Sequence, residues 1–190
     1  MNQSDENETD QRASSNEAIR RRVGRKLPDI IYGANDGIIT TFAVVSGVVG
    51  GNLSSQVVLI LGFANLLADG VSMGASNYLA KRSRGEDEEL LPHAEAARHG
   101  GVTFVSFVLI GAIPLFAYII APAGWRFLAA TVVTLLTLFV VGAMRAAWTQ
   151  SHWWRAGTEM LLVGAAAAGI AYGIGALMSR IVGTGVLAGA

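Results

Sequence analysis

Long apolar stretches separated by short polar linkers dominate this chain. Five stretches carry almost no charge, and they cover approximately residues 30–50, 57–80, 101–121, 126–147 and 158–181. A helix needs about 20 mainly apolar residues to cross the hydrocarbon core of a bilayer, and all five are that long. Because they are long and nearly charge-free, buried helices of a soluble protein explain them poorly. The pattern predicts an all-α integral membrane protein with five transmembrane helices.

The linkers between these stretches differ in charge. "GGNLSSQ" joins the first two stretches and is so short that they must form an antiparallel hairpin. Five Lys and Arg residues lie within 20–26 and four within 81–99, whereas the linkers on the other side carry almost none. Cytoplasmic loops are enriched in Lys and Arg, so the N-terminus is predicted to lie inside and the C-terminus outside.

The two ends of the chain differ from the region between them. Residues 1–19 are polar and are followed by the basic run, so residues 1–27 are expected to form a disordered tail. The five-helix domain would cover 28–185 with a short acidic cytoplasmic loop at 81–99, and 186–190 would form a C-terminal tail. Only 15% of residues are charged, against about 25% in soluble domains. There is no Cys for a disulfide or a Cys-based metal site, and no basic footprint for nucleic acid.

Two of the apolar stretches nevertheless contain polar side chains. "YGANDGIITTF" places Asn35 and Asp36 near the start of the first, and no Lys, Arg, Asp, Glu or His follows until after Ala68. In the second stretch, residues with a polar or sulfur atom recur every four positions and form a stripe on one side of a helix. The stripe consists of Asn65, Asp69, Met73 and Asn77. The predicted topology places Asp36, Met73 and Asn77 at similar depth on two antiparallel helices.

These polar groups suggest a metal site within the membrane. An ionisable residue at membrane depth is a functional-site candidate, because burying its charge is costly. A carboxylate combined with a thioether favours Fe²⁺, Mn²⁺, Co²⁺ or Zn²⁺ over Mg²⁺ or Ca²⁺. The expected metal ligands are Asp36, Met73, Asn35 and Asn77. The alternative is that these groups only hold helices together through hydrogen bonds.

Glycine spacing permits close packing of the predicted helices. Small residues four positions apart let two helix backbones approach each other. The pairs are Gly33/Gly37, Gly70/Gly74 and Gly169/Gly173.

Two sequence blocks at this spacing resemble a known family. "YGANDGIITTFAVVSGV" and "LADGVSMGASNYL" are similar to the vacuolar iron transporter family, in its bacterial and nodulin-like branches. The resemblance covers about residues 28–185 and includes "GTEMLLVGAAAAGIAYGIG" in the last stretch. It implies a homodimeric five-helix exporter that moves Fe²⁺ or Mn²⁺ out of the cytosol against protons. It also places the family's membrane aspartate at Asp36 and its membrane methionine at Met73.

The chain departs from the family pattern in two places. Iron-transporting members have a long Glu-rich cytoplasmic domain between the second and third spans, where this chain has only "KRSRGEDEELLPHAEAARHGG". Many relatives carry Glu at the position of Asn77, so one titratable group is missing here. Asp69 is the natural second proton carrier beside Asp36. A cytoplasmic entrance could be lined by Glu86, Asp87, Glu88, Glu89, Glu95 and Glu159. A solvated acidic loop is the simpler explanation of the first five, and Glu159 equally suits the N-terminus of the last helix.

The expected function is secondary transport of a divalent transition metal, with Fe²⁺ or Mn²⁺ as the transported ion and no cofactor. Proton antiport, a homodimer and a bacterial plasma membrane complete the hypothesis. The alternative is a membrane scaffold or stress protein that transports nothing. An enzyme is not expected, because no nucleophile–base pair is apparent.

Overall fold

The computed structural model describes residues 3–83, 91–149 and 151–183, and the side chains of 26–83, 91–146 and 151–183. The described residues form helices and no strand. The elements are α1 (Gln3–Gly50), α2 (Ser55–Arg82), α3 (His93–Gly111), α4 (Ile113–Ile120), the 3₁₀ turn η1 (Ala123–Trp125), α5 (Arg126–Thr149) and α6 (Trp153–Gly183).

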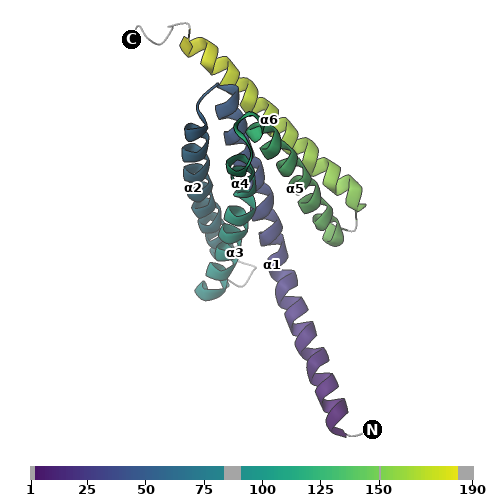
Figure 1. Cartoon of the computed structure of the whole chain (residues 1–190). Helices are drawn as coiled ribbons and strands as arrows, with labels where there is room; N and C mark the ends of the chain where they lie inside the picture. The colour runs from purple at the N-terminus through teal and green to yellow at the C-terminus, as the bar shows by residue number, and fades with distance from the viewer. Residues whose placement is uncertain (1–2, 84–90, 150, 184–190) are drawn as a thin grey trace.

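Helix α1 is the central element of the bundle. It packs against α2, α3, α5 and α6, and the two described ends of the chain lie at opposite ends of the molecule (Figure 1). Its N-terminal part extends beyond the other helices in the same view. The structure thus gives helix from Gln3 where a disordered tail over 1–27 was expected. Helical hydrogen bonds are local, so a helix started in the bundle can continue without packing partners.

Four helical stretches among the described residues are long and apolar enough to cross a membrane. They are Ser55–Arg82, His93–Ile120, Ala123–Ala146 and Trp153–Gly183. Their outer faces expose large apolar side chains; Ile60, Leu109 and Ile170 are each more than 60% exposed. Lipid would cover such faces in a membrane. The fifth expected span, 30–50, lies within α1 and is not among the four; Asn35 and Asp36 lower its hydropathy, so its crossing stays a prediction.

The boundaries of two predicted segments change. The span expected at 101–121 is divided into α3 and α4, with the break at Ala112. Pro114 at the start of α4 has no N–H to continue the ladder, yet Phe116 still donates to the Ala112 carbonyl at 3.0 Å. The loop expected at 81–99 is also shorter, because α2 continues to Arg82 and α3 begins at His93. The expected C-terminal tail, 186–190, lies outside the described residues.

Close packing of α1 on α3 depends on glycine. A Cβ at Gly37 would overlap the carbonyl oxygen of Phe107, and one at Gly33 would overlap Ser106. The first small-residue pair therefore lies in a helix contact, as predicted. Gly74 of α2 likewise faces α3, at Gly100. Gly169 and Gly173 have no atom of the described structure within 4 Å of a Cβ, so the third pair is not used inside the chain.

The Gly37→Ala variant should be less stable than the wild type by about 1–3 kcal/mol, because the added methyl must push α1 away from the α3 backbone. The measurement is thermal or denaturant unfolding in mild detergent. The matched control is Gly169→Ala, which fills open space and should leave the midpoint almost unchanged. Equal midpoints for the two variants would contradict tight backbone packing between α1 and α3.

Candidate metal site between α1 and α2

Asp36 on α1 and Asp69 on α2 lie at one level of the first hairpin, because Asp29 and Asn77, seven residues before Asp36 and eight after Asp69, are hydrogen-bonded to each other. The two carboxylates are near enough to interact electrostatically, and like charges repel at such separations. Asp69 accepts a hydrogen bond from Asn65 Nδ2 at 2.7 Å. The carboxylate of half-buried Asp36 forms no hydrogen bond or ion pair with any described residue. A divalent cation between these groups would relieve the repulsion.

Asn35, which precedes Asp36 in the chain, has an unsatisfied oxygen. Its Oδ1 is buried and has no hydrogen-bond partner among the described residues. A buried carbonyl oxygen without a partner costs roughly 1–3 kcal/mol. The amide oxygen of Asn35 is therefore suited to accept a cation or a water molecule bound to one.

Met73 lines a cavity at the N-terminal side of Asp36. The cavity has a volume of about 490 Å³ and is formed by α1 and α2. Its lining includes Asp29, Tyr32, Met73, Ser76 and Asn77. Tyr32 is 60% exposed, so the cavity lies at the outer surface of the single chain. Carboxylate, thioether, phenol and amide groups thus share one space.

The predicted ligands are distributed over two levels. Asp36 interacts with Asp69, whereas Met73 and Asn77 line the cavity one to two turns nearer the start of α1. Asp36 is not among the residues that line this cavity. The sequence had placed Asp36, Met73 and Asn77 at one depth. The antiparallel register instead brings Asp69 to the level of Asp36, and Met73 and Asn77 lie nearer the N-terminal end of α1.

Asn77 takes part in a buried network that joins three helices. Its Nδ2 donates to Asp29 Oδ1 at 2.9 Å and to Thr103 Oγ1 at 2.5 Å. His99 Nδ1 is hydrogen-bonded to the other oxygen of Asp29. Asp29 and His99 are 7% and 6% exposed, respectively. The Asn77 amide thus links α1, α2 and α3 through hydrogen bonds. For this residue of the stripe, the structure agrees with the alternative that its polar groups hold helices together.

The sequence analysis assigns no role to Asp29 or His99. His99 falls at the end of the loop expected at 81–99, but α3 begins at His93 and buries it. The available signal was the register of the hairpin, since pairing Asp36 with Asp69 brings Asn77 towards Asp29.

Replacing Asp29 with Ala should destabilise the protein by about 3–5 kcal/mol, because it leaves the buried donors of His99 and Asn77 without their acceptor. Unfolding in mild detergent measures this loss. The control is Glu159→Ala, since Glu159 is largely exposed and its 3.6 Å contact with Arg145 should contribute at most about 1 kcal/mol. A wild-type midpoint for Asp29→Ala would show that the network does not hold the three helices together.

The proposed entrance residues are only partly described. Glu86, Asp87, Glu88 and Glu89 lie outside the described residues. Glu95 is on the first turn of α3 and is partly exposed. Glu159 is on α6, beside Arg145 of α5. Neither of the two described members, Glu95 and Glu159, shares a site with Asp36.

One chain offers an incomplete metal site. Among the described residues, no group of three or more His, Cys, Asp or Glu side chains lies close enough to hold a metal ion. Asp36, Asp69 and Asn35 supply oxygen atoms, and Met73 supplies sulfur one level away. A metal ion bound here would need further ligands, from water or from a second copy of the chain.

The arrangement of a polar α1–α2 hairpin inside an apolar helical bundle agrees with comparisons of the whole sequence. A family model described as VIT family matches residues 27–97 and 85–176. The chain belongs to the VIT family. A vacuolar iron transporter of Toxoplasma gondii is 27% identical, over 84% of this chain and 76% of its own length. The vacuolar iron transporter of Plasmodium berghei is 28% identical, over 80% of this chain and 82% of its own length. Vacuolar iron transporter 1 of Arabidopsis thaliana is 26% identical, over 79% of this chain and 85% of its own length.

The matches also locate a difference from these VIT-family relatives. The alignment with the Toxoplasma gondii protein extends over 230 positions, although it covers 84% of a chain of 190 residues. Many of those positions therefore have no counterpart here. The two matched segments of the family model overlap over 85–97, which includes part of the α2–α3 connection and the first turn of α3. This agrees with the prediction that a cytoplasmic insertion between the second and third spans is absent from this chain.

Proposed function

We propose that this VIT-family chain is a secondary transporter that exports a divalent transition metal, Fe²⁺ or Mn²⁺, from the cytosol. The carboxylates of Asp36 and Asp69, which the Asn77–Asp29 hydrogen bond places at one level of the α1–α2 hairpin, carry the proposal. The names of the relatives, which are iron transporters, support the choice of substrate class. Co²⁺ and Zn²⁺ fit the same ligands and serve as comparison ions.

The geometry suggests an order of binding along the hairpin. The ion enters the cavity lined by Met73 and Asp29 and then moves one turn outward to Asp36 and Asp69, where Asn35 Oδ1 adds an oxygen ligand. The thioether of Met73 favours transition metals over Mg²⁺ and Ca²⁺. The acidic side chains at 86–89 would concentrate cations at the entrance.

A homodimer would complete the pathway. Ser72 and Ser76 are exposed beside the polar stripe, and Asp36 and Asp69 are only partly buried. Polar groups that face lipid are costly, so this side of α1 and α2 should face a second copy or a water-filled path. Two copies meeting there would also double the number of available ligands.

A Ser72→Cys variant should form a disulfide-linked dimer under mild oxidation, because the exposed Ser72 side chain lies beside the proposed pathway. The chain has no Cys of its own, so the added thiol is unique. The matched control is Val71→Cys, which is equally exposed but faces the groove beside α3. Non-reducing electrophoresis after purification from membranes measures the product. Equal cross-linking of the two variants, or none with Ser72→Cys, would contradict a dimer across this face.

The transport proposal is tested by metal uptake or release in liposomes that contain the purified protein. Fe²⁺, Mn²⁺, Co²⁺ and Zn²⁺ are compared, and empty liposomes set the background. Saturable flux of Fe²⁺ or Mn²⁺ is expected. The second candidate is a membrane scaffold whose polar groups only hold helices together. The hydrogen bonds among Asp29, Asn77 and His99 favour it, because they use Asn77 of the stripe for helix packing. No flux of any ion from folded protein would support the scaffold instead.

A further inference from the structure

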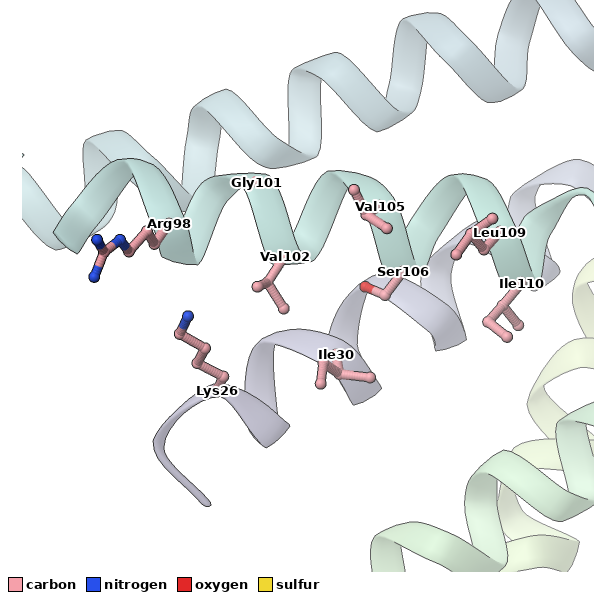
Figure 2. Close-up of a pocket in the computed structure, with 9 residues that line it drawn as sticks. All are labelled: Lys26, Ile30, Arg98, Gly101, Val102, Val105, Ser106, Leu109 and Ile110. Atoms are coloured by element: carbon pink, nitrogen blue, oxygen red, sulfur yellow. The ribbon is translucent and has the colours of Figure 1, made fainter. Parts of the chain in front are cut away.

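A groove with one basic end and one apolar end lies between α1 and α3, away from the α1–α2 site. Its volume is about 620 Å³. Figure 2 shows Lys26 and Arg98 at the same end of the groove, while apolar side chains continue along α3 and Ile30 adds to them from α1. The apolar lining consists of Ile30, Val102, Val105, Leu109 and Ile110.

The two cations of the groove have no partner within the described part of the protein. Neither Lys26 nor Arg98 forms an ion pair with any described residue. The nearest carboxylate along α1 is Asp29, and its two oxygens are bonded to Asn77 and His99. Two neighbouring cations without a protein anion attract an external one, and a phosphate accepts bonds from both Lys and Arg.

The length of the apolar part suits one leaflet of a bilayer. Arg98 and Ile110 are twelve residues apart on α3, which corresponds to about 18 Å along a helix. Half of the hydrocarbon core of a bilayer measures about 15 Å. A molecule with its anionic head at Lys26 and Arg98 could therefore place one acyl chain along the whole groove.

The floor of the groove has room for such a chain. A Cβ added at Gly101 would meet no described atom within 4 Å. Val105 and Leu109 are 50% and 66% exposed, so their apolar surfaces are open to an occupant. Charged side chains line only one end of the groove. A molecule with one anionic end and one apolar part therefore fits it better than a wholly apolar molecule.

We infer that this groove binds an anionic phospholipid of the leaflet that contacts the N-terminal end of α1. The phosphate is held by Lys26 and Arg98, and one acyl chain lies over Gly101 and along Val105 and Leu109. Under the proposed orientation this is the cytoplasmic leaflet, whose anionic lipids attract basic residues next to membrane helices. The inference does not depend on metal transport, because it uses none of the α1–α2 site.

Native mass spectrometry of the purified, delipidated protein tests the inference. Phosphatidylglycerol and phosphatidylcholine are added back separately at equal concentration. Phosphatidylglycerol should bind to the wild type at least about tenfold more tightly. The Lys26→Gln/Arg98→Gln variant should lose about thirtyfold in phosphatidylglycerol affinity, since each basic residue near the head group contributes about five- to sixfold.

Two controls separate the groove from general charge and from a protein partner. Lys81→Gln removes a cation at the end of α2, outside the groove, and should retain wild-type binding. Gly101→Phe fills the acyl position without removing charge and should weaken phosphatidylglycerol binding as well. Equal affinity for both lipids, or equal losses for Lys81→Gln and the double variant, would overturn the inference. Efficient disulfide cross-linking of a Val105→Cys variant in membranes would also overturn it, because a second copy would then occupy the groove.

Discussion

The Asp36→Asn variant is expected to lose at least about two orders of magnitude in metal flux while remaining folded. The amide has nearly the shape of the carboxylate but no charge to offer a divalent ion. Removing the carboxylate from a pair of opposite charges held out of water, here the carboxylate and the metal ion, costs about 3–5 kcal/mol, and 1.4 kcal/mol corresponds to a tenfold change in binding. The measurement is initial Fe²⁺ or Mn²⁺ flux in liposomes, with the unfolding midpoint recorded in parallel.

Thr40→Val provides the matched control for this loss. Thr40 lies one turn after Asp36, and its hydroxyl donates to the backbone carbonyl of Asp36 at 2.8 Å. Val keeps its shape and removes only that bond within the helix. Its flux should remain near that of the wild type. Wild-type flux in Asp36→Asn would remove the metal-site proposal, and equal losses in both variants would show that helix geometry rather than charge is responsible.

The positions of the apolar helices followed from the sequence because lipid imposes length and composition on each span independently. The expected segments 57–80, 126–147 and 158–181 lie inside α2, α5 and α6. The end of α2 and the start of α3 were placed less well, because charged residues near Arg82 and His93 look the same in a loop and in a helix that leaves the membrane.

The sequence predicted the polar stripe on α2, but not which of its residues bind metal and which hold helices together. The stripe follows from helix periodicity, which can be read from one segment alone. Asn77 was expected to bind metal, yet its amide bonds Asp29 and Thr103. That contact needs the packing of α3 against the first hairpin, and His99 and Asp29 are 70 residues apart in the chain. A local sequence pattern cannot predict a contact between residues so far apart in the chain.

The structure also changes how the central helix is understood. Asn35 and Asp36 keep α1 from reaching the hydropathy of the four candidate spans, but α1 packs against α2, α3, α4, α5 and α6. Those neighbours bury Ile38, Phe42 and Val45, and Phe42 stacks on Phe127 of α5 at 6.3 Å between ring centroids. A helix shielded by protein needs less apolar sequence than one that faces lipid. Its polar residues then cost less, and this position suits a transport pathway.

Proton coupling is the second large effect that we expect, and it centres on Asp69. Asp36 and Asp69 repel each other when both are ionised, and either a divalent cation or a proton relieves that repulsion. Metal and protons must therefore compete for the same pair, because carboxylates bind metal only when deprotonated. Acid on the inner side should slow export, and acid on the outer side should drive it by displacing the metal there.

The Asp69→Asn variant should uncouple the two fluxes. Asp36 remains to bind the ion, so metal affinity should fall by less than about tenfold, while the second proton acceptor is lost. Its partner Asn65 keeps a hydrogen-bonding neighbour in the new amide, so the fold should be retained.

A pH-sensitive dye inside liposomes reports proton movement while metal flux is followed separately. The matched control is Ser72→Ala, a neutral change on the same face. Wild-type protein should move protons against metal, and Asp69→Asn should move metal with little or no proton signal. Metal flux without proton movement in the wild type would make this protein a uniporter or channel, and unchanged coupling in Asp69→Asn would place the proton carrier elsewhere.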